Sequence, residues 1–241
     1  MTAKQRGIKL NGVLVIDKPL GWTSMDAVRK VRGAAGGRIK GPNKLKVGHA
    51  GTLDPLATGV LVICVGKATQ HVAQVMRQGK VYEATVDLSA FTATDDAEMA
   101  RQEVDVQQPP SVEQVDAALA KQTGLIQQVP PNFSAVHVDG QRAYKAARRG
   151  EMLKLRARQV RVDSIERLAY DWPMLELRIA CGKGTYIRSI ARDLGKLLDT
   201  GGHLRALKRT AVGDYTIDRA FPVDDLANGL TQDDLLPMPG D

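Results

Sequence analysis

Strand-like segments outnumber helix-like segments in this sequence, and the two kinds do not alternate strictly along the chain. A doubly wound parallel sheet needs a crossover helix between successive strands, so this order favours a different arrangement. We expect an α+β fold in which helices flank a mixed, largely antiparallel sheet. The segments expected to form strands are 12–18, 60–66, 81–88, 160–170, 174–182 and 203–217. The segments expected to form helices are 23–33, 68–79, 111–124 and 184–198.

The helix expected at 111–124 has the clearest start signal. Ser111 precedes an apolar, periodic stretch and Gln114 follows three residues later, which is the pattern of a capping box. Gly124 is a suitable residue to end this helix. The residues expected on its buried face are Val112, Val115 and Leu119.

The stretch 127–159 departs from this regular order, because it combines two prolines, a short strand pattern and a basic helix pattern. We expect it to be an excursion inserted into one large domain that covers residues 1–220. A domain of this length buries a sizeable core. Beyond Phe221 the sequence is acidic, and residues 221–241 are expected to form a tail with a short helix at most.

Positive charge is in excess and is unevenly distributed. Lysine and arginine number 34 against 27 aspartates and glutamates, which gives a formal net charge of +7. The basic residues concentrate in 1–46 and 142–161, whereas the acidic residues gather in 94–105 and from Asp214 onward. This pattern favours a basic binding face with a solvated back, and nucleic acid is one partner that suits such a face.

The two cysteines, Cys64 and Cys181, lie in apolar strand-like segments. Such positions are typical of buried free thiols, which suits a reducing cytoplasm. No apolar stretch is long enough to span a bilayer, and the basic N-terminus lacks the apolar region of a signal peptide. We therefore expect a cytoplasmic protein that does not associate with a membrane.

The segment "GHAGTLDP", residues 48–55, places one carboxylate in a glycine-rich loop before an apolar strand. Glycine lets a ligand approach the main chain, and Pro55 biases Asp54 toward an extended conformation. An ionised carboxylate held in this way can serve as a nucleophile, a general base or a metal ligand. On residue types alone, a polar turn capped by Asp54 is the favoured explanation of the segment, because Gly, Thr, Asp and Pro are common turn formers.

Other kinds of site have weaker support. The four histidines are scattered, and their spacing matches no zinc or calcium motif. The segment "CGKGTY" lacks the spacing of a phosphate-binding loop, and no serine stands in a hydrolase elbow. We therefore expect neither a metal nor an organic cofactor. A metal-dependent hydrolase that uses Asp17 and Asp54 remains an alternative.

The segment "GHAGTLDPLATGVLVICVGKAT" resembles the signature of the TruB-type pseudouridine synthases. Four more stretches resemble this family in the same order: "DKPLGWTS", "GKVYEATVDL", "FSAVHVDGQRAYKAARRG" and "CGKGTYIRSIARDLG". The resemblance extends from about residue 9 to residue 215. It implies a pseudouridine-synthase-like fold whose inserted excursion grips RNA.

The resemblance also implies roles for individual residues. Asp54 is expected to be the catalytic nucleophile, Arg188 to pair with it, and Tyr82 to stack on the target uracil. Taken singly, Tyr82 suits packing within a strand and Arg188 suits a solvated helix face; only the joint pattern favours a site. The residues expected to bind the base or its surroundings are His49, Tyr82, Tyr186 and Leu207. The residues expected to contact the RNA backbone are Lys18, Lys46, Arg142 and Lys183.

The family isomerises uridine 55 in the T-loop of tRNA, so the resemblance implies base flipping and an aspartate nucleophile. We expect a monomer that binds the T-arm of tRNA and needs no obligate protein partner. Family members often continue into a C-terminal PUA domain, and this sequence stops about where that domain would begin. His137 also stands where many members carry a lysine.

Two further alternatives stay open. The chain could be an RNA-binding or tRNA-folding protein in which synthase activity is incidental. It could also resemble the relative that works inside a guide-RNA particle on ribosomal RNA, although the basic tail of that relative is absent here.

Overall fold

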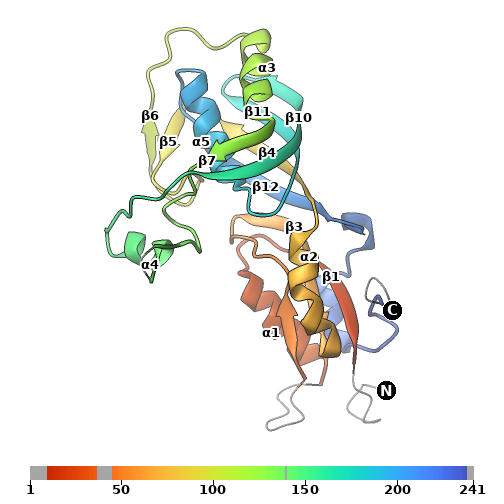
Figure 1. Cartoon of the computed structure of the whole chain (residues 1–241). Coiled ribbons are helices and arrows are strands. Elements are labelled where there is room, and N and C mark those ends of the chain that lie inside the picture. Colours follow the sequence, from red (N-terminus) through yellow and green to blue (C-terminus); the bar gives the residue numbers. More distant parts are fainter. Residues whose placement is uncertain (1–9, 37–44, 139, 238–241) are drawn as a thin grey trace. The chain divides into compact units, whose positions relative to one another are not determined.

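A computed structural model describes residues 10–36, 45–138 and 140–237 of the chain. The chain forms two compact units (Figure 1). Unit 1 comprises Met1–Val81 and Lys208–Asp241, and unit 2 comprises Tyr82–Leu207. The chain therefore crosses from one unit to the other twice, directly before Tyr82 and directly after Leu207. Two strands, β4 (Lys80–Asp87) and β12 (His203–Val212), contribute residues to both units.

Unit 1 is built on antiparallel strands. Strand β1 (Gly12–Lys18) pairs with β3 (Ala57–Val65) in a register that runs from Gly12 opposite Val65 to Lys18 opposite Gly59. The short strand β2 (Val47–His49) also pairs with β3, and β12 follows β3 in the sheet. The remaining elements of unit 1 are α1 (Ser24–Ala34), η2 (Gly66–His71), α2 (Val72–Arg77), β13 (Tyr215–Thr216), η3 (Ile217–Arg219) and η4 (Val223–Asn228).

The core of unit 1 lies on one face of β1 and β3. Alternate residues of a strand point to the same face, and Val60, Val62 and Cys64 of β3 share this face. They pack with Val13 and Val15 of β1 in one buried cluster. The continuous apolar run of β3 is buried along almost its whole length, which confirms the prediction of a fully buried strand.

Residues 221–236 are part of unit 1. The backbone N–H of Phe221 donates to the Val15 carbonyl at 2.7 Å, and Val13 and Leu236 exchange two backbone hydrogen bonds of 2.8 Å. Leu226 is only 2% exposed and Leu230 only 1%. The expectation of a separate acidic tail after residue 220 therefore differs from the structure: the apolar residues between the acidic ones bury against the N-terminal strand.

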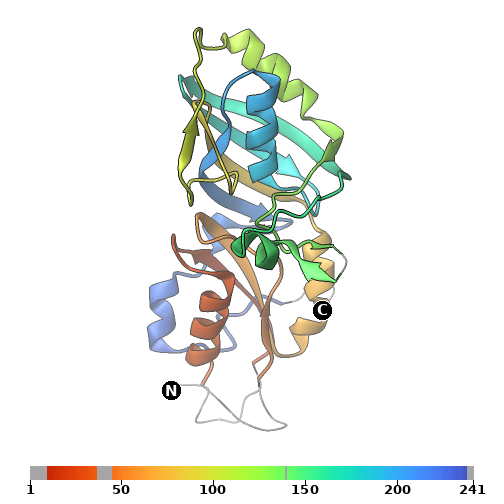
Figure 2. The same cartoon turned by 90° about the vertical axis from the view of Figure 1, so that its left-hand side faces the viewer.

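Unit 2 contains the strands β12, β4, β11 (Met174–Cys181), β10 (Arg158–Asp171) and β7 (Gly124–Gln128), in that order. Strand β10 pairs antiparallel with β11 on one side and with β7 on the other. The helices α3 (Val112–Lys121) and α5 (Ile187–Leu197) contact one another, and α5 lies across the strands of this unit (Figure 2). Together with unit 1, this confirms the α+β class and the largely antiparallel sheet.

The stretch between β7 and β10 leaves the sheet of unit 2. It carries β8 (His137–Val138), β9 (Gln141–Arg142) and the short helix α4 (Ala143–Arg148). A second small hairpin, β5 (Ala90–Thr92) with β6 (Arg101–Glu103), precedes α3. Figure 1 shows α4 apart from the strands of unit 2, as an excursion would be. Hereafter, residues 129–157 are called the excursion.

Local signals placed the helices well but not their ends. Ser111 accepts from the Gln114 backbone and the Gln114 side chain bonds back, which confirms the capping box. Val112 is 40% exposed, so the buried face begins one turn later than expected. Thr23 is the N-cap of α1, and this helix continues through Gly33. The helix expected at 68–79 divides into the 3-10 helix η2 and the α-helix α2.

None of the helices in the described parts of the chain is long and apolar enough to cross a membrane.

The packing of residues 221–236 is tested by changing Leu226 to Ala. Because Leu226 is buried, its truncation is expected to lower the free energy of unfolding by about 2–5 kcal/mol. Urea denaturation followed by circular dichroism measures this change. Leu20, which is 66% exposed, provides the control, and Leu20→Ala should leave the midpoint nearly unchanged. An equally small effect of Leu226→Ala would show that the segment does not stabilise unit 1.

Candidate functional site

Asp54 lies in the connection between two strands of unit 1. Strands β2 and β3 pair antiparallel, with His49 opposite Ile63, and residues 50–56 link them. The Ala50 N–H continues the pairing by donating to the Val62 carbonyl at 2.8 Å. Asp54 itself is half-buried, and its carbonyl accepts from the Ala57 N–H at 3.0 Å. The carboxylate thus belongs to a tight hairpin connection rather than to a long free loop.

Two residues of the segment 17–24 form hydrogen bonds to this connection. The Ser24 hydroxyl donates to the Leu53 carbonyl at 3.1 Å and accepts from the Leu53 N–H at 2.8 Å. The N–H and the carbonyl of Leu53, the residue before Asp54, therefore both bind the buried hydroxyl of Ser24. The Gly21 N–H also donates to the Pro55 carbonyl at 2.9 Å. Asp54 thus has a fixed residue on each side.

Arg209, on β12, supports the start of the same connection. Its side chain is buried, its Nη2 donates to the Gly51 carbonyl at 3.2 Å and its Nε donates to the Val60 carbonyl at 2.8 Å. Gly59 lets the backbone of β12 come close, because a Cβ at this position would lie 2.2 Å from the Arg209 carbonyl oxygen. A buried guanidinium therefore binds the connection to the sheet.

Lys18 is buried and is not available to RNA phosphates, which corrects the expectation that it contacts the RNA backbone. Its Nζ donates to the Pro19 carbonyl at 3.0 Å and to the Trp22 carbonyl at 2.7 Å. Burial lowers the pKa of Lys18 from 10.5 to about 8, although the Asp54 and Asp26 carboxylates oppose this shift. Lys18 thus stabilises the turn that carries Gly21 and lies within electrostatic reach of Asp54.

His49 and Lys46 lie on the N-terminal side of the connection. His49 is partly buried, and its pKa is lowered by burial and by the positive charge of Arg209. Its Nδ1 atom is buried and has no hydrogen-bond partner within the described residues. Lys46 is exposed. Burial and Arg209 thus disfavour the charged form of His49, whereas the Lys46 side chain is open to solvent.

Arg188 occupies the first turn of α5 in unit 2. Its side chain is buried, so the interpretation as a solvated helix face is wrong. Its Nη1 donates to the Thr94 carbonyl at 3.1 Å and lies 3.4 Å from Oδ2 of the buried Asp96. Its Nη2 donates to the Phe133 carbonyl at 3.0 Å. The guanidinium thus joins α5 to two separate loops of the unit.

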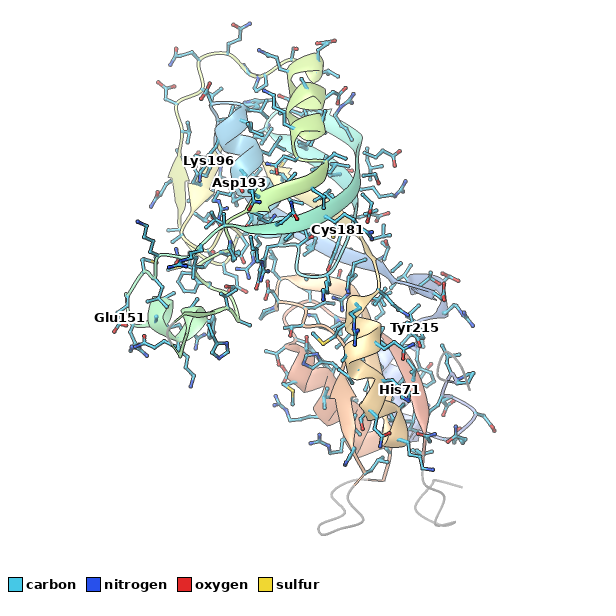
Figure 3. All side chains as sticks on the ribbon, viewed as in Figure 1. His71, Glu151, Cys181, Asp193, Lys196 and Tyr215 are labelled. Atoms are coloured by element: carbon cyan, nitrogen blue, oxygen red, sulfur yellow. The ribbon has the colours of Figure 1, made fainter. Side chains whose placement is uncertain are left out.

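A second arginine follows one turn later on the same helix. Arg192 lies 2.9 Å from the carboxylate of Asp95, the neighbour of Asp96, and also bonds to Asp193, which Figure 3 labels. Residues four apart on a helix share a face, so α5 presents two guanidinium groups to two successive carboxylates. Burial raises the pKa of Asp95 even though the Arg192 charge opposes the shift. The loop at 94–96 is therefore fastened to α5 by two ion pairs.

The other expected site residues of unit 2 occupy varied surroundings. Tyr82 is buried on β4, Tyr186 is half-buried directly before α5, and Leu207 is half-buried on β12. Lys183 lies exposed in the turn between β11 and α5. Arg142 belongs to β9, but its side chain lies outside the described residues. The expected residues are thus divided: unit 1 carries Asp54, His49, Lys18 and Lys46, and unit 2 carries the rest.

Sequence reasoning missed three residues that support these sites. Ser24 was noted only as part of the helix expected at 23–33, whereas its hydroxyl binds Leu53. Arg209 was noted only as part of the strand expected at 203–217, and Asp96 was counted among the acidic residues of 94–105. Each is buried and bonds to a residue far away in sequence, so no local pattern could have revealed its role.

The described part of the chain contains no group of three or more His, Cys, Asp or Glu side chains that could hold a metal ion. Asp17, the second carboxylate of the hydrolase alternative, is exposed on β1, between the buried residues Ile16 and Lys18.

The buried Lys18 predicts a pH dependence of stability. Its pKa of about 8 in the folded protein lies below the ordinary 10.5, so between these values the unfolded chain binds more protons than the folded one. The free energy of unfolding contributed by this group should therefore rise as the pH increases from 8 toward 10.5. Urea denaturation of wild type and Lys18→Met at several pH values measures the difference. A difference that does not change with pH would contradict the buried ammonium.

Comparison with known families identifies the chain over nearly its whole length. The model of the TruB family pseudouridylate synthase N-terminal domain matches residues 38–187. The model of the tRNA pseudouridylate synthase B C-terminal domain matches residues 188–236, which include most of the segment that was expected to be a tail.

Curated relatives named tRNA pseudouridine synthase B are similar over most of the chain. The relative from Thermobifida fusca is 48% identical over 235 residues, which cover 92% of this chain and 76% of that protein. The relative from Phocaeicola vulgatus is 45% identical over 226 residues, which cover 92% of this chain and 94% of that protein.

Solved structures are similar at lower identity. An H/ACA RNP bound to a substrate RNA containing 2′-deoxyuridine matches with a TM-score of 0.65 and 26% identity, over 90% of this chain and 52% of that one. A Cbf5-Nop10-Gar1 complex matches with a TM-score of 0.69 and 28% identity, over 95% of this chain and 58% of that one. The chain thus spans little more than half the length of these structural relatives. On the family models and the curated relatives, the chain belongs to the TruB family of pseudouridylate synthases.

Proposed function

We propose that this protein converts uridine to pseudouridine at position 55 in the T-loop of tRNA. The observation that carries the proposal is the 48% identity to a tRNA pseudouridine synthase B over 92% of the chain. The presence of Asp54, Tyr82 and Arg188 in the matching motifs supports it. We expect the protein to act in the cytoplasm, as a monomer and without an obligate protein partner.

The reaction detaches the uracil ring and rejoins it through carbon. The bond between C1′ of the ribose and N1 of the base breaks, and a bond between C1′ and C5 forms. The proton on C5 is lost and N1 gains one, so no atom enters or leaves overall. The ring must turn relative to the sugar, so the uridine has to leave the helical stack first.

Asp54 is proposed as the nucleophile that forms a covalent bond to the substrate during this rearrangement. Its surroundings within unit 1 suit the role, because Ser24 and Gly21 fix the residues on either side of it. A carboxylate held in one place needs little reorganisation to reach the reacting atom.

Tyr82 and Arg188 are proposed to complete the catalytic set from unit 2. A tyrosine ring that stacks on an extruded base contributes roughly 1–3 kcal/mol. Tyr82 is the residue at which the chain enters unit 2, and Leu207, a proposed wall of the pocket with Tyr186, is the one at which it leaves. Arg188 would favour the ionised form of Asp54 and hold its orientation.

The RNA backbone is proposed to meet exposed basic groups. Lys46 and Lys183 are exposed, and Arg142 belongs to the basic excursion. Contacts of lysine and arginine with phosphates release counterions, so the affinity for RNA should fall as the salt concentration rises. His49 is proposed to contact the RNA near the flipped base. Lys18 is not included, because its ammonium is buried.

The activity is tested on an unmodified T-arm transcript with one substituted carboxylate. Asp54→Asn keeps the shape of the side chain but removes the nucleophile, so pseudouridine formation should become undetectable while RNA binding persists. Asp17→Asn is the matched control in the same unit and should retain full activity. Pseudouridine is measured by chemical mapping of the product. A wild type that binds the RNA without forming pseudouridine would favour the RNA-binding alternative.

The geometry of the Arg188 guanidinium is tested by Arg188→Lys. Lysine keeps the positive charge but cannot span Thr94, Phe133 and Asp96 together, so turnover should fall roughly hundredfold or more. Arg178→Lys is the control, because Arg178 makes exposed ion pairs with Glu83 and Glu166. RNA affinity should change little in either variant. Near wild-type turnover of Arg188→Lys would show that a positive charge suffices and that the fixed guanidinium fork is not required.

The guide-RNA alternative predicts a different requirement. The structural relatives include an H/ACA RNP and a Cbf5-Nop10-Gar1 complex, whereas the curated relatives at 45–48% identity are named for tRNA. Activity of the isolated protein on a bare tRNA transcript, at position 55 and not at other uridines, supports the tRNA proposal. A strict need for a guide RNA or for partner proteins would support the alternative.

A further inference from the structure

Tyr186 precedes the first residue of α5 as its N-cap, but its side chain makes no capping hydrogen bond. Its backbone is held instead by Gln128, the last residue of β7. The Gln128 side-chain Nε2 donates to the Tyr186 carbonyl at 3.1 Å, and its Oε1 accepts from the Tyr186 N–H at 2.8 Å. Gln128 is only 1% exposed. Both ends of a buried, planar amide therefore fix the main chain of one tyrosine.

The ring of Tyr186 is held by a second residue. The guanidinium of Arg158 lies over the ring, with its Cζ atom 5.0 Å from the ring centroid. Its Nη2 donates to the Gly184 carbonyl at 2.5 Å, which ties it to the turn before Tyr186. A guanidinium that stacks on an aromatic face leaves the ring fewer orientations. One face of the Tyr186 ring is thus covered and its rotation is restricted.

Hydrogen bonds alone do not explain the position of the Arg158 side chain. Its Nε atom is buried and has no acceptor within the described residues. Leaving a buried donor unpaired is unfavourable, so the stacking on Tyr186 and the bond to Gly184 must outweigh this cost. The position of Arg158 is therefore tied to the tyrosine ring.

Gln128 and Arg158 are also neighbours of each other. They are opposite one another in the antiparallel pairing of β7 with β10, and they form the last pair at one end of it. Opposite residues of an antiparallel pair point to the same face of the sheet, which explains how both reach Tyr186. Between them the chain makes the excursion, residues 129–157. The two residues at the base of the excursion thus converge on one tyrosine.

We propose that Gln128 and Arg158 are positioning residues that hold Tyr186 in place against the target uracil. This inference rests on the proposed function, in which Tyr186 lines the uracil pocket. A fixed ring keeps the base in the geometry that reacts, so loss of either residue should slow the chemical step more than it weakens binding. All four residues involved, including Gly184, belong to unit 2.

The first test is Arg158→Lys, which keeps the charge and removes the planar group. The single-turnover rate on a T-arm transcript should fall about tenfold to hundredfold, because a small displacement of a positioned group has effects of this size. The dissociation constant of the RNA should stay within about twofold and its salt dependence should not change. The matched control is Arg161→Lys on the same strand, since Arg161 is exposed and pairs with Asp163.

A double-mutant cycle with Tyr186→Leu then tests whether Arg158 affects the rate through the Tyr186 ring. If Arg158 acts through the tyrosine ring, Arg158→Lys should cause no further loss when the ring is absent. The same cycle with Gln128→Met, which has a similar volume but no amide, tests the second residue. Hydrogen exchange of the peptide that contains Tyr186 should become faster in Gln128→Met.

Several results would overturn the inference. These are a wild-type rate for Arg158→Lys, additive losses in the Tyr186→Leu background, or weaker RNA binding with an altered salt dependence and an intact rate. The last result would make Arg158 a phosphate contact. If wild type forms no pseudouridine while exchange at Tyr186 still responds to Gln128→Met, the proposed function fails although the two residues do hold Tyr186.

Discussion

Buried carbonyl groups need donors, and in both units of this protein arginine side chains supply many of them. Arg209 donates to Gly51 and Val60, and Arg188 donates to Thr94 and Phe133. A backbone carbonyl that loses water and gains no donor destabilises the fold, so irregular segments can enter the interior only where such donors exist. The guanidinium group suits this task because its donors form a rigid fork that reaches two segments at once.

The same arrangement serves the proposed chemistry. Asp54 stands in a connection of only seven residues between β2 and β3, and Ser24 satisfies both backbone groups of its neighbour Leu53. Arg188 is held by Asp96 as well as by carbonyls, so its position does not depend on the substrate. Groups that are fixed before the substrate arrives lower the cost of reaching the transition state. The contacts that stabilise these loops therefore also fix the groups that are proposed to act in catalysis.

Two requirements that usually conflict meet where the excursion joins the sheet. A segment that grips RNA benefits from exposed basic residues and from irregular backbone, whereas a residue that lines a base pocket must be rigid. Here the excursion leaves and rejoins the sheet at Gln128 and Arg158, which pair across the ladder. The regular end of the ladder, rather than the excursion itself, carries the contacts to Tyr186. In the proposed function, the adaptable RNA contacts and the rigid pocket wall therefore belong to adjacent but separate segments.

The sequence by itself determined the α+β class, most of the elements, the capping box at Ser111, the buried strand β3 and the family. These rest on local periodicity, capping pairs and motifs, which residues close in the chain specify. Only the tertiary structure decided that Lys18 is buried, that residues 221–236 pack on β1, and that Ser24, Arg209, Asp96 and Gln128 bind residues far away in sequence. Each of these depends on groups brought together from distant parts of the chain, and neither long-range hydrogen bonds nor the burial of a single polar side chain leaves a periodic pattern in a sequence.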